Sequence, residues 1–551
     1  PTGQPITIRL RTAANDLSNA TLVVYNVNTA VDSSGTLWNV QNTRIATDGT
    51  YDTYEFVIPA SPDARTLYYK FRLQDGSDCD WYIDNYAHNS YDHEDRYENG
   101  TGMMVNGLTG NPCSASADGY ANNSFNITVY DQSAFTNHLD SWAANAVIYQ
   151  ILPDRFRNGD PANDTAWPYA DVYGSPINNH AAWNEPVEDA RLTNGWSRDF
   201  FGGDLQGVMD ELDYLQSQGV TAVYFNPIFA SPSNHGYDTT DYLHISPRYG
   251  DNALFAQLNA EAEARGIKII LDGVFNHTGS DSVYFDRYGR WDANGNPTTA
   301  SNNSGACENQ SSFYNAFYTF LPGVGPCAGR TDGSQNYDSW WGYDTLPLLN
   351  ENTAVTDYIF DSANDDVSPT AVIQYWYNLG ADGWRFDVAD EISHAFWTQF
   401  RAQVKNNDAL NGPLYSEVWY EATPWLYGDQ LDATMNYRYR KAVLGFLIDA
   451  TWTDNDNNGD QTMYALSPSE FDYVLGSIRE DYPAEAWYSM MNLMDSHDTN
   501  RALFVLREQS TDLPNALAKM KMMAALQFTY PGAPTIYFGD EVGLGARDYG
   551  G

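Results

Sequence analysis

The first part of the chain alternates hydrophobic and polar residues at the period of a β-strand. Stretches of this kind lie at residues 6–10, 20–25, 54–58 and 67–73, and turn-forming Asn, Asp, Ser and Gly residues separate them. No long stretch with helical periodicity interrupts them. The pattern predicts an all-β sandwich domain over residues 1–130, close in size to an immunoglobulin domain.

Beyond this region, short apolar runs alternate with stretches of helical periodicity. The strand-like runs lie at residues 147–152, 222–225, 267–271, 383–388, 414–418, 490–494 and 535–538. The helical stretches lie at residues 205–218, 254–265, 371–379, 392–404 and 515–526. Regular β/α alternation predicts a parallel sheet, and the number of units predicts an α/β fold, a (β/α)8 TIM barrel over residues 131–551.

One connection in the predicted barrel is much longer than the others. Residues 278–352 are rich in Gly, Asn, Ser, Asp and aromatic residues and follow the third predicted strand. Loops of this length in compact domains are usually functional or form a small unit of their own. We therefore expect an inserted subdomain over residues 278–352, at the barrel end where such folds build active sites.

The composition narrows the classes of partner. The chain has 551 residues, of which 42% are hydrophobic, and a formal net charge of −43. A surface this acidic repels nucleic acid phosphates and anionic membranes but suits neutral substrates and cations such as calcium. No apolar run approaches the roughly 18 residues that a membrane span needs. We expect neither a nucleic acid nor a membrane partner.

The four cysteines are Cys79, Cys113, Cys307 and Cys327. None forms a close Cys-x-x-Cys pair, so zinc or redox chemistry is a poor fit. Their even number, in two local pairs, indicates two disulfides and hence a secreted, extracellular protein. The alternative is four buried free thiols.

Charged and polar residues cluster directly after the predicted strands, where a barrel places them at its mouth. The clusters contain Asp272 and His277, then Arg385 and Asp387, then Glu417, and finally His497 and Asp498. Cleavage of an acetal needs one ionised carboxylate to attack the anomeric carbon and one protonated carboxyl to donate to the leaving oxygen. We expect Arg385 to keep Asp387 ionised. A single carboxylate at a strand end is more often a solvated or helix-capping residue, but a converging set favours chemistry.

These four segments, in this order, resemble the four short sequence regions of the α-amylase family of glycoside hydrolases. Residues 219–229, 236–242, 201–205 and 532–541 are also similar to that family, so the resemblance covers residues 141–545. It implies that Asp387 is the nucleophile of a retaining double displacement and that Glu417 is the general acid and then the base. Asp498 would hold sugar hydroxyls and favour the distorted transition state.

The resemblance implies supporting roles for five further residues. Arg385 would orient the nucleophile, His277 and His497 would hydrogen-bond the sugar, Tyr237 would stack on it, and Asp272 would support the site from the barrel rim. Structural hydrogen bonding is the alternative for the two histidines. For Asp272 the alternative is that it simply braces Arg385.

The N-terminal sandwich and the segment 346–350, Leu-Pro-Leu-Leu-Asn, resemble the neopullulanase, cyclomaltodextrinase and maltogenic amylase branch. That branch commonly has Met-Pro-Lys-Leu-Asn there, and often Asn where this chain has Asp390. Secreted amylopullulanases share the architecture. The implied activity is hydrolysis of α-1,4, and also α-1,6, glucosidic bonds in starch, maltodextrins or pullulan. The sandwich would resemble a carbohydrate-binding module.

Two other functions stay open. A transglycosylase or a cyclodextrin-acting enzyme would use the same catalytic machinery and differ in the acceptor. A non-catalytic carbohydrate-binding homologue is of another class, and the intact set Asp387, Glu417 and Asp498 argues against it.

A polar loop after the first predicted barrel strand suits a calcium ion, which takes about six to eight oxygen ligands. It resembles a calcium loop of the pullulan-hydrolysing relatives, which implies as ligands Asn158, Asp160, Asn163 and Asp164, together with the Gly202 carbonyl and Asp204. An Asx-rich turn is the alternative.

The chain stops soon after residues 538–541, which resemble the family's eighth-strand motif, whereas family members normally continue into a C-terminal β-domain. That β-domain is expected to be absent from this chain. We accordingly expect a complementary C-terminal fragment or a dimer partner, because an unclosed barrel would expose apolar surface.

Overall fold

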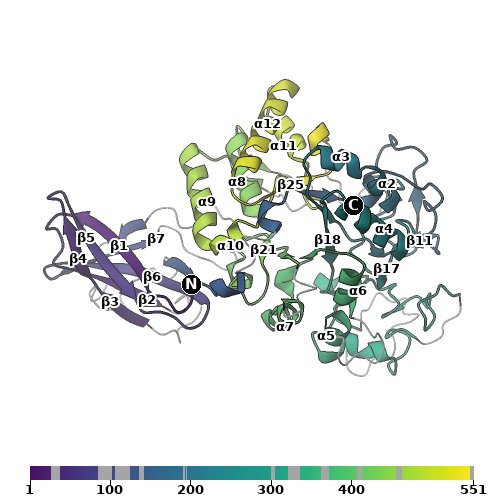
Figure 1. The fold of residues 1–551 in the computed structure, drawn as a ribbon, viewed down its shortest axis with the longest axis horizontal. Helices are drawn as coiled ribbons and strands as arrows, with labels where there is room; N and C mark the ends of the chain where they lie inside the picture. The colour runs from purple at the N-terminus through teal and green to yellow at the C-terminus, as the bar shows by residue number, and fades with distance from the viewer. Residues whose placement is uncertain are drawn as a thin grey trace.

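A computed structural model shows a β-sandwich beside a larger α/β domain, at the left and right of Figure 1. The structure describes residues 1–25, 37–84, 102–105, 124–135, 142–189, 193, 195–299, 304–320, 336–360, 371–405, 412–453 and 462–545. Within this part of the chain, no helix is both long and apolar enough to cross a membrane.

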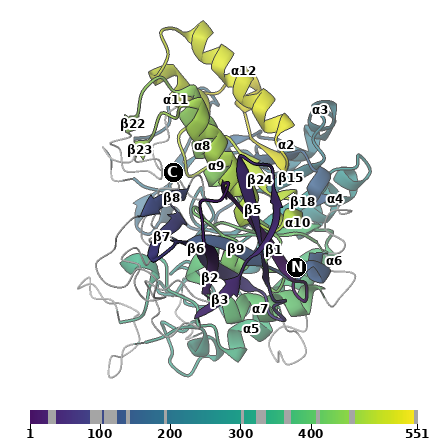
Figure 2. The ribbon, with the colours of Figure 1, turned by 90° about the vertical axis from the view of Figure 1, so that its left-hand side faces the viewer.

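Antiparallel strands form the two sheets of the N-terminal sandwich, which faces the viewer in Figure 2. One sheet has the order β1 (Ile6–Ala13), β5 (Tyr51–Ile58), β4 (Thr43–Thr47). The other has the order β3 (Leu37–Gln41), β2 (Asn19–Tyr25), β6 (Arg65–Asp75), β7 (Asp78–Asp84), β8 (Gly102–Val105), and β9 (Phe125–Val129) also pairs with β6. Alternate residues of the facing strands, such as Leu22, Val24, Phe56 and Phe71, are buried in a shared core. This explains the period of two in the sequence.

The second domain contains a parallel sheet that closes into a barrel. In the described part of the chain its strands are β10 (Ile148–Ile151), β15 (Ala222–Phe225), β18 (Lys268–Gly273), β19 (Gly383–Phe386), β20 (Leu414–Ser416), β21 (Ala433–Thr434), β24 (Met491–Leu493) and β25 (Ala533–Tyr537). Each strand pairs in parallel with its neighbour, and β25 pairs with both β10 and β24. A parallel bridge between Met435 and Met491 joins the remaining two edges. The fold is a (β/α)8 barrel, as predicted.

Helices lie between most successive barrel strands and cover the sheet, although only a 3-10 turn, Thr423–Trp425, lies between β20 and β21 (Figure 1). They are α2 (Leu205–Asp210), α3 (Leu212–Ser217), α4 (Asn252–Glu263), α5 (Thr353–Ile359), α6 (Val372–Asn378), α7 (His394–Lys405), α8 (Tyr437–Leu447), α9 (Pro468–Asp481), α10 (Ala484–Trp487), α11 (Ala502–Glu508) and α12 (Leu513–Thr529). Polar caps define several of their starts: Asp251 accepts a hydrogen bond from Leu254 N at 2.8 Å, and Ser467 and Glu470 form a capping box.

The prediction of a single helix over residues 205–218 is wrong. At Glu211 the backbone leaves helical geometry, with φ −101° and ψ 6°, and its N–H bonds to Val208 O instead of continuing the helical ladder. The chain therefore forms two short helices, α2 and α3, in place of one.

Short two-stranded ribbons decorate the barrel. They are β11 (Asp171–Val172) with β12 (Ser175–Pro176), β13 (Asn178–Asn179) with β14 (Asp199–Phe200), β16 (Phe229–Ala230) with β17 (Asp241–Ile245), and β22 (Trp452–Thr453) with β23 (Thr462–Met463). The insertion after β18 returns to the barrel through a bridge between His277 and Leu348 and a hydrogen bond from Thr278 N to Pro347 O. It is the inserted subdomain expected after the third strand.

The sandwich contacts the barrel through β6, β9 and the segment after β9. Thr128 Oγ1 donates to the Asp481 carbonyl at 2.7 Å, Thr66 Oγ1 bonds with the Tyr427 hydroxyl at 2.7 Å, and Asp131 N donates to Tyr427 O at 2.9 Å. Both partners belong to the outer side of the barrel domain, on α9 and in the connection after β20. These contacts fix the sandwich against the barrel wall.

Candidate active site

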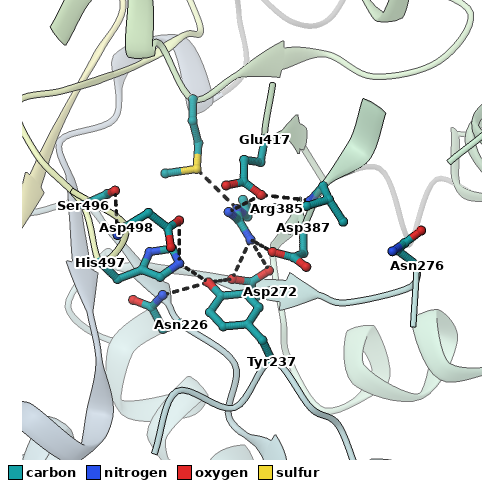
Figure 3. A network of polar contacts seen from close by, with 12 residues as sticks. Asn226, Tyr237, Asp272, Asn276, Arg385, Asp387, Glu417, Ser496, His497 and Asp498 are labelled. Carbon is teal, nitrogen blue, oxygen red and sulfur yellow. Dashed lines mark hydrogen bonds and ion pairs between the residues drawn. The ribbon is translucent and has the colours of Figure 1, made fainter. Parts of the chain in front are cut away.

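The centre of the site is Arg385, a fully buried guanidinium on β19. Its Nη1 donates to both oxygens of Asp272, at 2.9 and 3.1 Å, and to Asp387 Oδ1 at 3.2 Å. Its Nη2 forms an ion pair with Glu417 Oε2 at 2.9 Å. Figure 3 shows the guanidinium between these three carboxylates. They come from β18, β19 and β20, whose carboxyl ends meet at the barrel mouth.

Glu417 is held on both of its oxygens. Its Oε2 accepts a hydrogen bond from Val388 N at 2.9 Å, and its Oε1 accepts one from Trp419 Nε1 at 3.0 Å. Val388 has φ 39° and ψ 50°, a left-handed conformation that is unusual for a β-branched residue. Strain of this kind persists where the surrounding structure enforces it, and here it turns an amide toward the carboxylate. The Trp419 ring stacks on Tyr437 with centroids 3.9 Å apart.

The pKa of Asp387 differs from the expectation that Arg385 keeps this residue ionised. Burial raises the pKa of Asp387 well above its usual value, the charge of Glu417 raises it further, and Arg385 opposes both. Arg385 offsets the effect of burial on Asp387 only in part, because its single charge is shared with Asp272 and Glu417. Burial and the neighbouring carboxylate therefore outweigh the guanidinium in setting the pKa of Asp387.

Asp498 and His497 follow β24 and form the other side of the site. His497 Nδ1 contacts Gln150 Nε2 at 3.1 Å. Nε2 lies 3.0 Å from Asp498 Oδ2. Burial acts to raise the pKa of Asp498, but the charge and hydrogen bond of His497 lower it below its usual value. The Asp498 side chain, 38% exposed, is an ionised group open to a ligand.

Tyr237 links the two halves of the site. Its hydroxyl donates to Asp272 Oδ2 at 2.9 Å, accepts from Asn226 Nδ2 at 2.9 Å, and contacts His497 Nε2 at 2.6 Å. Its ring stacks on that of His497 with an interplanar angle of 9°. One face of the Tyr237 ring is therefore covered by the His497 ring of the same chain. Asp272 also accepts a hydrogen bond from Tyr224 at 2.6 Å, so it braces Arg385 as part of a buried network.

His277 is buried with protein partners on both ring nitrogens. Asn276 Nδ2 lies 3.2 Å from Nδ1, and Nε2 lies 3.1 Å from the Tyr237 carbonyl oxygen. Burial lowers its pKa to about 4, so the ring is neutral near pH 7. In this arrangement it supports Tyr237, and its ring stacks on Trp340 with centroids 5.3 Å apart.

The loop predicted to bind calcium lies beside α2. Asn158 Nδ2 donates to Asp164 Oδ1 at 2.8 Å, and Asn163 Nδ2 donates to Asp204 Oδ2 at 3.1 Å. Asp204 also caps α2 by accepting from Gly207 N, while Asp160 turns its exposed side chain to Ala162 N. Within the described residues, no group of three or more His, Cys, Asp or Glu is arranged for a metal ion. Any cation here would depend on amide and carbonyl oxygens as well.

Sequence reasoning assigned no role to several residues that the structure places in the site. Trp419 and Val388 lie within the motifs, but nothing in the sequence shows where an indole or a backbone amide points. Tyr224 had a usable signal, since a tyrosine in a fully buried strand needs a partner for its hydroxyl. Tyr437 had no such signal in the sequence, because the strand before it, β21, has only two residues and cannot be recognised from periodicity.

Fold and site together define a (β/α)8-barrel protein with paired carboxylates at the barrel mouth. A family model described as the α-amylase catalytic domain matches residues 150–548, and one described as the α-amylase N-terminal Ig-like domain matches residues 2–102. The chain belongs to the α-amylase family, which confirms the resemblance found in the sequence.

Several relatives come from the branch that the sequence indicated. The chain is 37% identical over 574 aligned residues to an amylopullulanase of Thermoanaerobacter thermohydrosulfuricus, covering 99% of this chain and 36% of that protein. It is 34% identical over 563 residues to a cyclomaltodextrinase of a Bacillus species, covering 100% of this chain and 80% of that protein. A solved cyclomaltodextrinase structure matches with a TM-score of 0.59 and 32% identity, covering 100% of this chain and 77% of that one. The chain spans less than half the length of the amylopullulanases that it matches.

Proposed function

We propose that this chain hydrolyses α-glucosidic bonds in starch, maltodextrins or pullulan with retention of anomeric configuration. The observation that carries the proposal is the buried Arg385, which contacts Asp272, Asp387 and Glu417 at the barrel mouth. One guanidinium holding a carboxylate pair together supplies the two groups that a double displacement needs. The names of the relatives, amylopullulanase and cyclomaltodextrinase, support α-glucans as the substrate class.

In the proposed reaction, Asp387 attacks the anomeric carbon while Glu417 donates its proton to the leaving oxygen. This step requires Glu417 to carry its proton and Asp387 to be ionised when the substrate is bound. Water then attacks the glycosyl-enzyme as Glu417 takes a proton back. Asp498, ionised and partly exposed, would bind sugar hydroxyls, and Tyr237 and His497 would form the wall beside it.

Product analysis tests this proposal. The purified chain is incubated with pullulan, soluble starch and a cyclodextrin, with Glu417→Gln as the inactive control. Panose from pullulan indicates α-1,4 cleavage, and maltotriose indicates α-1,6 cleavage. We expect a loss of at least roughly 10³-fold in the control, since the general acid is removed. A chain that is as inert as its control on all three substrates contradicts the proposal.

We also propose a structural calcium ion at Asn158, Asn163, Asp164, Asp204 and the Gly202 carbonyl. Two observations support it. The Oδ1 atoms of Asn158 and Asn163 are buried without a hydrogen-bond partner in the described part of the chain, and burial raises the pKa of Asp164. Bound calcium would satisfy the oxygens and favour an ionised Asp164.

Metal analysis of the dialysed protein and thermal unfolding with and without a chelator test the calcium proposal. We expect about one calcium per chain and a lower unfolding temperature in chelator, which calcium but not magnesium restores. Asn163→Ala should remove the difference between the two conditions. A metal-free protein whose unfolding temperature ignores both ions contradicts the proposal.

We further propose that Cys79–Cys113 and Cys307–Cys327 are disulfides of a secreted protein. Cys79 and Cys307 are buried, and the structure shows no free cysteine among the residues it describes. Cys113 and Cys327 lie outside the described residues. Thiol titration of the denatured protein decides the question: no reactive thiol before reduction and four after it agrees with the proposal. Four thiols before reduction contradict it.

A further inference from the structure

An exposed tryptophan lies on the inserted subdomain, next to the site. Trp341 is 75% exposed and Tyr343 is 57% exposed, while Trp340 between them and the site is half-buried. Large aromatic side chains at a protein surface bury much area when a ligand covers them, and they are enriched at binding sites. We call Trp340, Trp341 and Tyr343 the aromatic platform.

The platform is continuous with the site. The Trp341 ring stacks on Trp340 with centroids 5.1 Å apart and an interplanar angle of 24°. Trp340 in turn stacks on His277, with centroids 5.3 Å apart and an angle of 17°. His277 contacts the Tyr237 carbonyl at 3.1 Å. A row of near-parallel rings therefore runs from His277, which supports Tyr237, through Trp340 to Trp341 at the surface.

A second contact ties the platform to the segment that carries Asp387. Trp341 Nε1 donates to Glu391 Oε1 at 3.1 Å, and Glu391 follows Asp387 by four residues. The indole is thus positioned from two sides, by a ring on one face and by a carboxylate on its edge. A polar edge and an open apolar face are the properties with which an indole binds a sugar ring.

The backbone of Trp341 is strained. It has φ 48° and ψ 22°, in the left-handed region, where a bulky residue is an outlier. Such strain costs free energy, so its presence at an exposed position suggests that the ring is held there for a purpose other than stability. Asn at this position would relieve the strain, because Asn tolerates the left-handed conformation.

We propose that Trp341 is a binding residue for a glucosyl unit of an α-glucan chain beyond the units that contact the catalytic groups. The inference rests on the proposed function and adds a subsite to it. The platform takes neutral sugar rings, which stack on Trp341 and hydrogen-bond Glu391. Long substrates reach it, and short ones end before it.

Binding to a non-cleaving background tests the inference. In Glu417→Gln, titration with maltoheptaose and with maltose gives two dissociation constants and their ratio. Trp341→Asn in this background should weaken maltoheptaose binding by roughly tenfold. The preference for maltoheptaose over maltose, given by the ratio of the two dissociation constants, should decrease. Trp341→Tyr should restore most of the affinity, since it keeps a stacking ring. Phe528→Ala, on the outer helix α12 at a position 51% exposed, is the control and should bind both sugars like its parent.

Stability gives a readout that a structural role would not produce. Trp341→Asn should unfold at the same temperature as the parent or higher, because the strain is relieved while binding is lost. An unchanged ratio of dissociation constants overturns the inference but leaves the proposed function intact. A change in sedimentation behaviour with no change in sugar binding also overturns it, and assigns the platform to a protein interface. If the wild-type chain cleaves no α-glucan and the background binds none, both proposals fail.

Discussion

At the scale of single residues, the site is built on one shared charge. Arg385 serves Asp272, Asp387 and Glu417, so no carboxylate has a cation to itself. Burial and the neighbouring carboxylate therefore dominate the pKa of Asp387, which lies well above its usual value. Placing three carboxyl groups around one buried guanidinium costs stability, and the cost is largest when all three are ionised.

Asp387→Asn should abolish activity, by at least roughly 10⁴-fold, because the nucleophile is lost. It should also raise the thermal unfolding temperature by a few degrees at pH 7–8. The pKa of Asp387 is higher in the folded than in the unfolded chain, so its ionisation destabilises the fold as the pH rises through the folded-state pKa. The neutral amide avoids this cost.

The pH dependence of this difference in stability tests the direction of the effect. The gain in unfolding temperature of the Asn variant should shrink as the pH falls toward about 4, the ordinary pKa of an unfolded Asp. Asp387 then becomes neutral in both the folded and the unfolded chain, so its ionisation no longer costs stability. Unfolding followed by circular dichroism between pH 4 and 8 measures it. A variant that is less stable than wild type at every pH shows that the ion pair with Arg385 outweighs the burial of Asp387.

At the scale of elements, glycines and caps place the loops that end the strands. Gly202, in the proposed calcium loop, has φ 81°, and a Cβ there would lie 2.7 Å from Asn158 Nδ2 and from Asp164 Oδ1. Gly174 has a similar φ of 88° but nothing within 4 Å of its Cβ position. The two glycines share a left-handed backbone, which a substituted residue would adopt only with strain, and they differ in their surroundings.

Gly202→Ala should lower the free energy of unfolding by about 2–4 kcal/mol, from the strained backbone and the steric contact together. Gly174→Ala should lower it by about 1 kcal/mol, from the backbone alone. Denaturant unfolding of both variants, with calcium held constant, measures the difference. Equal losses would show that the Asn158–Asp164 loop yields to the new methyl group.

At the scale of the whole molecule, hydrogen bonds to the outside of the barrel hold the sandwich. Thr128 Oγ1 donates to the Asp481 carbonyl at 2.7 Å, and Gln132 Nε2 donates to Glu485 Oε1 at 2.9 Å. The contact lies on α9 and α10, on the side of the barrel domain that faces the sandwich (Figure 1). Through these residues the sandwich stabilises the outer wall of the barrel.

Thr128→Val should weaken the contact between the domains by about 0.5–1 kcal/mol, the lower part of the usual range, because Thr423 Oγ1 still donates to the same carbonyl at 3.0 Å. Scanning calorimetry should show the two domains unfolding over more widely separated temperatures. Thr7→Val, on an exposed position of β1, is the matched control. Identical thermograms for both variants would show that this hydrogen bond does not couple the domains.

The sequence by itself determined the elements whose periodicity is set by burial. The barrel strand predicted at residues 222–225 matches β15 (Ala222–Phe225) because a strand buried on both faces must be apolar throughout. The ordered motifs around Asp272, Asp387, Glu417 and Asp498 gave the family. Strand β21 escaped prediction because two residues carry no period, and only its neighbours β20 and Met491 hold it in the sheet.

Tertiary structure alone decided how the charges are shared and which surfaces stay open. Sequence motifs place Arg385 beside Asp387, but only the closed barrel brings Asp272 and Glu417 to the same guanidinium. The pKa of Asp387 therefore rises, where a single adjacent cation would lower it. His277 similarly turns out to have both nitrogens occupied by the protein, and Trp341 to be strained and exposed. Local periodicity follows from burial and can be read along the chain. Desolvation and the sharing of a charge depend on groups far apart in the sequence, so they exist only once the chain has folded.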